Sequence, residues 1–315
     1  MSNLQADPAV GPEGGPVELL DGATVALGGP RGMAVTRTLP NRRRRMVGAW
    51  CFLDAYGPDD LAGTPGMRVG PHPHIGLQTV SWLVQGEVLH RDSLGHLQEI
   101  RPGQLNLMTA GRGISHSEET PAVNSGVLQG VQLWVALPEP ARTRPPAFTH
   151  HGDLPVLDFG DLLATVIMGE LGGAVSPAAT YSPLTGAEIT AAAGADGVVP
   201  LRADFEYAVL TLDGAATIDG QELKPGPLLY LGEGRTSLRI EAGPATRVLL
   251  LGGEPFGEEL VMWWNFVACT HEEVVEARAS WESGSLFGEV HGYAGPPLPA
   301  PPMPISRLVP RGRIR

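Results

Sequence analysis

The sequence predicts an all-β protein made of two tandem β-barrels, followed by a short C-terminal helix and an extended tail. Short apolar runs separated by turn signals recur along the 315 residues, which include 42 glycines and 30 prolines. Apolar repeats with a helical period are scarce, and this combination favours many short strands joined by turns. The second half of the chain also repeats the outline of the first half, as a duplicated barrel would.

The first half contains the strand signals of one barrel. Residues 1–16 are polar and rich in glycine and proline, so we expect a flexible arm there. Residues 77–92 predict a strand, a Gln-Gly turn and a second strand, and residues 99–111 predict a strand end, a Pro-Gly turn and another strand. A buried strand follows at 130–138. We therefore expect an N-terminal barrel over 17–145.

The proline-rich segment 138–148, PEPARTRPPAF, is the predicted domain boundary, because it should interrupt any strand ladder. A second barrel is then expected over 146–285. The turn signals that recur in both halves are Gly86 and Gly214 and the Pro-Gly pairs 102–103 and 225–226. Their matching spacing indicates two similar barrels from a duplication.

The clearest helix signal is THEEVVEARASWESG, residues 270–284. Thr270 can cap this helix, and Glu273 completes a capping box. Its apolar stripe consists of Val274, Ala277 and Trp281. We assign the helix to the C-terminal domain, packed on a barrel, and expect a proline-rich, extended tail over 286–315.

The charge balance argues against nucleic-acid binding, since 34 acidic residues outnumber 22 basic ones and the net charge is −12. The run Arg42 to Arg45 fits a solvated or internally paired strand edge better than a phosphate-binding patch. The two cysteines, Cys51 and Cys269, indicate neither a disulfide framework nor a zinc ribbon. With no signal-peptide pattern and no membrane-length apolar run, we expect a cytoplasmic protein that does not bind membranes.

Two pairs of metal-ligating residue types occur at a spacing of two. His72 and His74 lie in GPHPHIGLQT, and His116 and Glu118 lie in TAGRGISHSEE. Alternate residues of a strand share one face, and Pro73 stiffens the first pair in an extended form. The first pair alone also fits two surface histidines on a rigid turn. Together, the two pairs on adjacent strands of a barrel offer three imidazoles and one carboxylate, which suits a divalent transition metal and iron above all.

The residues around these pairs resemble the pirins, members of the cupin superfamily built as two tandem barrels. The matching segments are HPHIGLQTVSWLVQGEVLHRDSLG at 72–95, IRPGQLNLMTAGRGISHSE at 100–118 and VQLWVALP at 131–138. Residues 46–58 and 257–277 match more loosely. The resemblance implies two cupin-type, jelly-roll barrels, with one iron in the first barrel held by His72, His74, His116 and Glu118. Manganese, nickel, cobalt, copper and zinc are the alternative metals for this ligand set.

One position departs from the family pattern. Many pirins have a glutamate shortly after the His-x-His pair, where this chain has Gln78. A neutral amide cannot be the anionic ligand, so that role goes to Glu118, and Gln78 is interpreted as a hydrogen-bonding residue beside the ligands or in the pocket. Counting the same distances in the second barrel places Pro200, Arg202, Arg239 and Glu241 at the ligand positions. Arginine cannot coordinate a cation, so we expect the second barrel to be metal-free.

Several other signals are weaker. The tripeptide His90-Arg91-Asp92 also occurs in kinase catalytic loops, but the sequence lacks the glycine-rich nucleotide loop of a kinase. We interpret it as the polar end of a strand, where one of the side chains could face the pocket mouth. Trp263, Trp264 and Phe266 are expected to pack in the core or an interface rather than around a cofactor. The histidines expected to be exposed are His150, His151 and His271.

Two functions fit the expected metal site. The first is a quercetin 2,3-dioxygenase acting on flavonol-like chelating substrates, with Glu118 as the general base that accepts the substrate's hydroxyl proton. The alternative is an iron-dependent redox-sensing regulator that binds a transcription factor or a metabolic enzyme through a nearby surface, for example Arg42 to Arg45. The expected partners are accordingly a small aromatic substrate or another protein, with no direct contact to nucleic acid.

Overall fold

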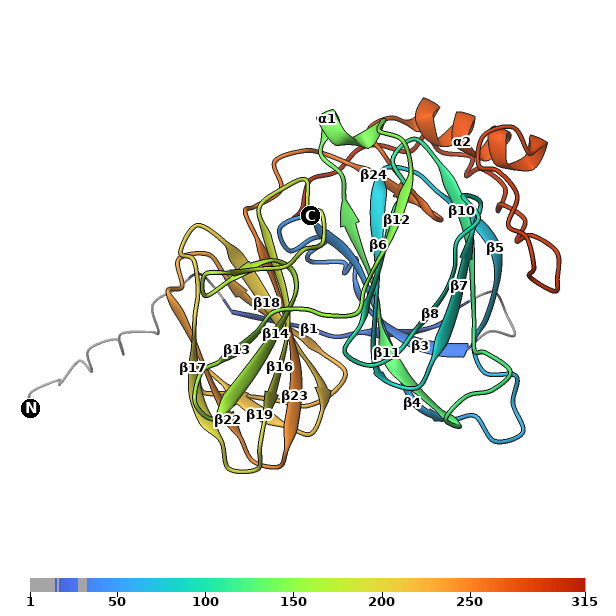
Figure 1. The fold of residues 1–315 in the computed structure, drawn as a ribbon. Helices are drawn as coiled ribbons and strands as arrows, with labels where there is room; N and C mark the ends of the chain where they lie inside the picture. Colours follow the sequence, from blue (N-terminus) through green and yellow to red (C-terminus); the bar gives the residue numbers. More distant parts are fainter. Residues whose placement is uncertain (1–14, 16, 28–32, 315) are drawn as a thin grey trace, which may run out of the picture.

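The computed structural model describes residues 15, 17–27 and 33–314, so the predicted arm over 1–16 lies almost entirely outside the described residues. Two β-barrels lie side by side, and the helix α2 (His271–Ser283) lies over one end of the first barrel (Figure 1). The predicted all-β fold with two tandem barrels is confirmed.

The first barrel packs a seven-stranded sheet against a four-stranded sheet. Its strands are β2 (Ala23–Leu27), β3 (Met33–Leu39), β4 (Trp50–Asp60), β5 (Arg68–His74), β6 (Leu77–Gln85), β7 (Val88–Asp92), β8 (Leu97–Ile100), β9 (Leu105–Thr109), β10 (Ile114–Glu119), β11 (Val127–Ala136) and β12 (Ala147–His151). The larger sheet has the order β12-β9-β6-β11-β4-β3-β2 and the smaller one β5-β10-β7-β8. All pairs are antiparallel, so side chains alternate between the interior and the outside.

The second barrel packs an eight-stranded sheet against a four-stranded sheet. Its strands are β1 (Glu18–Leu20), β13 (Val156–Asp158), β14 (Leu162–Leu171), β15 (Ala174–Val175), β16 (Leu184–Ala191), β17 (Asp196–Pro200), β18 (Glu206–Asp213), β19 (Ala216–Ile218), β20 (Gln221–Leu223), β21 (Leu228–Gly232), β22 (Ser237–Ala242) and β23 (Thr246–Gly253). The larger sheet has the order β1-β21-β18-β23-β16-β14-β13, with β15 paired to β14, and the smaller one has β17-β22-β19-β20.

The strand orders of the two barrels correspond. The small sheet β17-β22-β19-β20 repeats β5-β10-β7-β8, and the run β21-β18-β23-β16 repeats β9-β6-β11-β4. The turn after β6 contains Gly86 at φ 88°, and the turn after β18 contains Gly214 at φ 75°. Both glycines adopt the left-handed conformation that a side chain would disfavour, so the two turns recur for the same physical reason.

The predicted register between the barrels is wrong, because it places outward-facing residues at the ligand positions. The residues matched by counting to the metal ligands are exposed or partly exposed, namely Pro200, Arg202, Arg239 and Glu241. Arg239 pairs with Asp196 on the outside of the barrel, at 2.6 Å. The inward positions of β22 are the neighbouring Leu238 and Ile240, both fully buried. A shift of one residue exchanges the faces of a strand, so the true counterparts are aliphatic side chains.

The proline-rich segment does not end the first sheet. A four-residue helix, α1 (Glu139–Arg142), forms within it, and β12 beyond it pairs with β9 of the first barrel. The first sheet therefore continues to residue 151, past the boundary expected at 145. In the opposite direction, β1 precedes the first barrel in sequence but pairs with β21 of the second.

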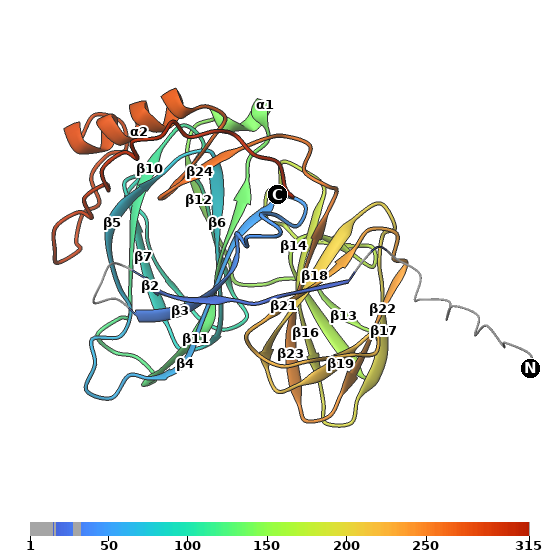
Figure 2. The same cartoon turned by 180° about the vertical axis from the view of Figure 1, so that it is seen from behind.

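The C-terminal segment also returns to the first barrel, although we assigned the helix to the second domain (Figure 2). The strands β24 (Val261–Trp263) and β25 (Phe266–Ala268) form a hairpin, and Val267 N donates to Ile75 O at 3.1 Å. The helix α2 is confirmed, with the Thr270 side chain accepting from Glu273 N. Farther along, Leu298 N donates to Pro71 O at 2.8 Å and ties the tail to β5.

The two barrels share a hydrophobic core. Trp50 of β4 is fully buried, and its Nε1 donates to Thr185 O and Gly252 O of the second barrel at 3.1 and 3.2 Å. Trp82 of β6 donates to Glu188 Oε2 at 2.8 Å. Because each indole buries a large apolar area while its N–H stays bonded, these residues fix the barrels against one another.

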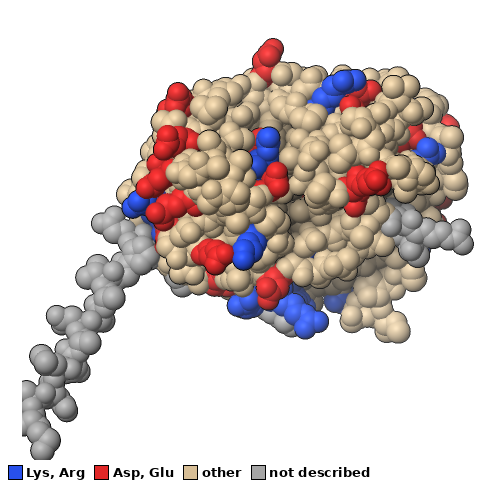
Figure 3. Space-filling view, turned by 90° about the horizontal axis from the view of Figure 1, so that it is seen from below, with Lys and Arg blue, Asp and Glu red and all other residues tan. Residues whose placement is uncertain are grey.

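The arginine run is internally paired. Arg44 is only 4% exposed, and its guanidinium lies 2.7 Å from Glu18 and 3.7 Å from Glu206. The expected internal pairing is thus confirmed for Arg44, which lies between β3 and β4 and on neither strand. On the face seen in Figure 3, acidic and basic side chains are interspersed. Among the described residues, no helix is both long enough and apolar enough to span a membrane.

Candidate metal centre

The predicted ligands lie on two paired strands of the small sheet in the first barrel. β5 and β10 are antiparallel, with His72 opposite His116 and His74 opposite Ile114. A register irregularity lies between His116 and Glu118. The spacing of two places both members of each pair on the inner face, and all four side chains line one cavity.

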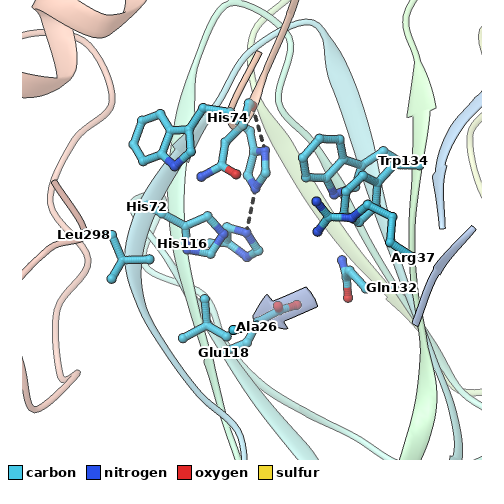
Figure 4. Close-up of a pocket in the computed structure, with 13 residues that line it drawn as sticks. Ala26, Arg37, His72, His74, His116, Glu118, Gln132, Trp134 and Leu298 are labelled. Carbon is cyan, nitrogen blue, oxygen red and sulfur yellow. Dashed lines mark hydrogen bonds between the residues drawn. The ribbon is translucent and has the colours of Figure 1, made fainter. Parts of the chain in front are cut away.

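The three histidines form a compact cluster (Figure 4). One ring nitrogen from each of His72, His74 and His116 lies within 4.8 Å of the others. The closest pair is His74 Nε2 and His116 Nε2, at 3.1 Å. The three histidines are at most 6% exposed, so these ring nitrogens lie close together in a site shielded from solvent.

Backbone carbonyls determine which nitrogen of two rings carries the proton. His72 Nδ1 lies 2.8 Å from Gly70 O, and His74 Nδ1 lies 3.0 Å from Asn265 O. A carbonyl only accepts, so Nδ1–H is the donor and Nε2 keeps its lone pair. Burial lowers the pKa of His72 to about 4, and burial with a neighbouring imidazole lowers that of His74 well below its usual value. Both rings are therefore neutral, as metal ligands must be.

Glu118 provides the anionic group of the cavity. Its Oε1 lies 3.2 Å from Ser81 Oγ, and burial raises its pKa to about 7. A carboxylate oxygen of Glu118 also lies within 4.8 Å of ring nitrogens of His116 and His90. Glu118 thus groups with His116 and His90, and it lines the same cavity as His72 and His74. Three imidazoles and a carboxylate on one cavity fit a divalent transition metal in residue type, because such ions prefer nitrogen donors with a hard oxygen completing the set.

The opposite wall of the cavity is aromatic and comes from the large sheet. Phe52 and Trp134 stack with ring centroids 4.0 Å apart at 12°, and the Arg37 guanidinium lies 4.4 Å from the Phe52 centroid. Arg37 Nε and Nη2 each donate to the buried Asp54 at 2.8 Å. The cavity between this wall and the histidines has a volume of about 350 Å³ (Figure 4). It is large enough for a small organic molecule.

The C-terminal segment completes the cavity. Trp264, Asn265 and Leu298 line it, and Trp264 has a φ of 53°, an unusual value for a bulky residue. Trp264 and Phe266 pack in one apolar cluster, as expected, and Trp264 in addition lines the cavity. The position of these residues depends on contacts over about two hundred positions of sequence, which no local pattern indicates.

Gln78 does not belong to the cavity. Its Nε2 donates to Thr109 Oγ1 at 3.0 Å and to Ala179 O of the second barrel at 3.1 Å. Ser81 contacts Glu118 inside the barrel, and Gln78, three positions earlier on β6, faces the opposite way. The interpretation of Gln78 as a pocket residue is corrected accordingly.

Histidines outside the predicted set are more buried than expected. His90 of β7 is 3% exposed and contacts His116 from behind, without lining the cavity. His150 Nδ1 lies 2.7 Å from Asn106 Oδ1, and His271 Nδ1 accepts from Leu308 N at 3.1 Å. The signal that could have identified His90 is its spacing of two from Asp92 on a strand, the same period that singled out the ligands.

Two barrels of matching strand order, one with a histidine-lined interior, define the chain as a bicupin. The family model Pirin matches residues 32–135, and the model for the pirin C-terminal cupin domain matches residues 186–287. The chain belongs to the pirin family.

Relatives cover most of its length. A Pseudomonas aeruginosa protein named "Putative quercetin 2,3-dioxygenase PA1205" is 47% identical over 274 residues, which is 87% of each chain. A pirin-like protein of Caulobacter vibrioides is 39% identical over 80% of this chain and 89% of its own. A crystal structure of a quercetin 2,3-dioxygenase from Acinetobacter baumannii is 42% identical, with a TM-score of 0.88 over 92% of this chain and 96% of its own.

Proposed function

We propose that the protein is a metal-dependent oxygenase of the quercetin 2,3-dioxygenase type, with one transition metal, expected to be iron, held by His72, His74, His116 and Glu118. The main support is the cavity itself, in which a cluster of neutral imidazoles faces an aromatic wall. A bound metal supplies a Lewis acid and open positions for oxygen ligands. Relatives named as quercetin 2,3-dioxygenases favour a flavonol-like, chelating substrate.

The residues of the cavity have separate roles in this proposal. The stacked pair Phe52 and Trp134, with Arg37 over the Phe52 ring, gives the cavity an aromatic wall against which the apolar part of a substrate packs. Burial raises the pKa of Glu118 to about 7, so the side chain is partly ionised near pH 7. Its ionised form takes the proton of the substrate hydroxyl. Arg37 Nη1 has no partner within the described part of the chain and is available to donate to a substrate oxygen.

The decisive experiment is oxygen uptake by iron-loaded protein in the presence of quercetin. We expect slow turnover that stops when a chelator removes the metal and returns when iron is restored. Oxygen uptake by an oxygen electrode and loss of quercetin absorbance should agree. No uptake with any flavonol, combined with partner binding that depends on the oxidation state of the iron, would replace this proposal with the regulator.

The described structure gives the regulator less support than the sequence did. The surface suggested for it was the run Arg42 to Arg45, but Arg44 is buried in ion pairs with Glu18 and Glu206. Arg43 and Arg45 donate to backbone carbonyls of distant segments. Arg43, Arg44 and Arg45 therefore bind segments near both ends of the described chain, and only Arg42 and Arg43 are exposed.

Arg37 provides a test of substrate binding. Replacing Arg37 with methionine and Asp54 with asparagine together removes the guanidinium without leaving a buried charge unpaired. We expect the Kd for quercetin to rise about tenfold or more, because a hydrogen bond to a charged group contributes about 1.5–3 kcal/mol. Quenching of tryptophan fluorescence in metal-loaded protein measures this change, since Trp134 and Trp264 line the cavity.

The matched control is Arg68→Met on β5, whose side chain is exposed and pairs with Glu119 at 3.2 Å outside the cavity. This variant should bind quercetin as the wild type does. Equal affinity in the Arg37 double variant would show that Arg37 has no role in substrate binding.

A further inference from the structure

His116 differs from the other two histidines of the cluster in how its second nitrogen is held. His72 and His74 each donate from Nδ1 to a backbone carbonyl, which leaves Nε2 free to bind a metal. The Nδ1 of His116 instead faces another imidazole nitrogen, His90 Nδ1, at 3.4 Å. An imidazole can donate or accept at this position, so the contact by itself does not decide which nitrogen of His116 is protonated.

Asp92 determines the tautomer of His90. His90 Nε2 lies 3.2 Å from Asp92 Oδ2, and a carboxylate accepts, so His90 carries its proton on Nε2. His90 Nδ1 is then a lone pair, which accepts the Nδ1–H of His116. In the metal-free protein the lone pair of His74 Nε2, at 3.1 Å, is a second acceptor for the His116 proton (Figure 4). A metal bound by both Nε2 atoms requires both to be unprotonated, and the His116 proton then lies on Nδ1, where His90 Nδ1 accepts it.

Both relay residues are held firmly. Asp92 Oδ1 accepts from Leu94 N at 2.9 Å and from His96 N at 3.1 Å, so the turn after β7 fixes its carboxylate. His90 stacks on Phe148 of β12, with ring centroids 4.4 Å apart at 12°. Its two nitrogens are directed at His116 and Asp92, and it does not line the cavity.

We propose that Asp92 and His90 are positioning residues that set the tautomer and orientation of His116 for metal binding. This inference rests on the proposed metal site and concerns residues that do not touch the metal or the substrate. Partners behind a ligating histidine fix its ring and tautomer, and their loss costs about 10–100-fold in metal affinity. The backbone performs this function for His72 and His74, whereas His116 depends on two side chains.

The sharpest test is Asp92→Asn. Because Leu94 N and His96 N donate to one oxygen of this side chain, the amide of asparagine should place its oxygen there and its NH₂ towards His90 Nε2. The relay then reverses: His90 protonates at Nδ1, donates to His116 Nδ1, and leaves the His116 proton on Nε2. We expect metal affinity, measured by competition with a chelator, to fall about 10–100-fold.

Two further variants separate this effect from loss of packing. His90→Phe keeps a ring against Phe148 but removes both nitrogens, and should lose affinity to a similar degree. His96→Gln is the matched control, because it alters another contact of Asp92 while leaving the acceptor for His90 in place. It should bind metal as the wild type does.

Long-range ¹H–¹⁵N NMR of the metal-free protein tests the relay without any metal. The wild type should show His90 protonated at Nε2, and Asp92→Asn should show it protonated at Nδ1. Unchanged tautomers, or equal metal affinity in wild type and Asp92→Asn, would overturn the inference. A wild type that binds no metal at all would instead refute the proposed function, while the NMR result would still decide the relay.

Discussion

His116→Ala should lose most of the metal that the wild-type protein carries, which we expect to be close to one transition metal per chain. His116 lies at the centre of the site, with ring nitrogens near His74 on one side and His90 on the other. Its removal takes away a ligand itself, so the loss of affinity should exceed the about 10–100-fold cost of losing a partner behind a ligand. Elemental analysis of purified, dialysed protein measures the result.

His150→Ala is the control for this experiment. His150 lies on β12, contacts Asn106 and does not line the cavity, so its variant should keep full metal content. Thermal unfolding should first show that both variants fold. Unchanged metal content in a folded His116→Ala protein would refute the proposed ligand set.

Glu118→Gln should lose far more turnover than metal. An amide oxygen can still contact the ion, but the amide cannot take the proton of a substrate hydroxyl. Loss of a general base lowers turnover by about 10²–10⁴-fold. The comparison requires kcat for quercetin oxygenation and metal content to be measured on the same preparation.

The next residue along the strand offers a matched control. Glu119 faces the opposite side of β10 and pairs with Arg91 and Arg68. Glu119→Gln should therefore oxygenate quercetin at the wild-type rate. If Glu118→Gln retained wild-type turnover per bound metal, Glu118 would be only a ligand, and another group would have to accept the proton.

The features predicted well from the sequence are local ones. The spacing of two between His72 and His74, and again between His116 and Glu118, is a property of a single strand. It placed all four side chains inside the barrel because alternate residues of a strand share a face. The capped helix after Thr270 and the turn glycines Gly86 and Gly214 follow from equally local rules.

The features that were missed depend on contacts distant in sequence. Trp264 lines the cavity only because β25 lies beside Ile75, almost two hundred residues earlier. The predicted register of the second barrel was wrong because counting from turns cannot detect a one-residue shift. Arg239, predicted at a ligand position, faces outward and pairs with Asp196. Gln78 was interpreted as a hydrogen-bonding residue beside the ligands or in the pocket, but the alternation of β6 directs it towards the second barrel.

The construction of the cavity from both ends of the chain has a consequence for biosynthesis. The acceptor of His74, Asn265 O, and the cavity residue Leu298 are translated well after the ligand strands β5 and β10. A nascent chain that has already formed β5 and β10 still lacks the group that sets the His74 tautomer. A chain translated only as far as β10 therefore has the proposed ligand residues without the carbonyl that sets the His74 tautomer. The site reaches its described arrangement only after the second barrel and β25 have been translated.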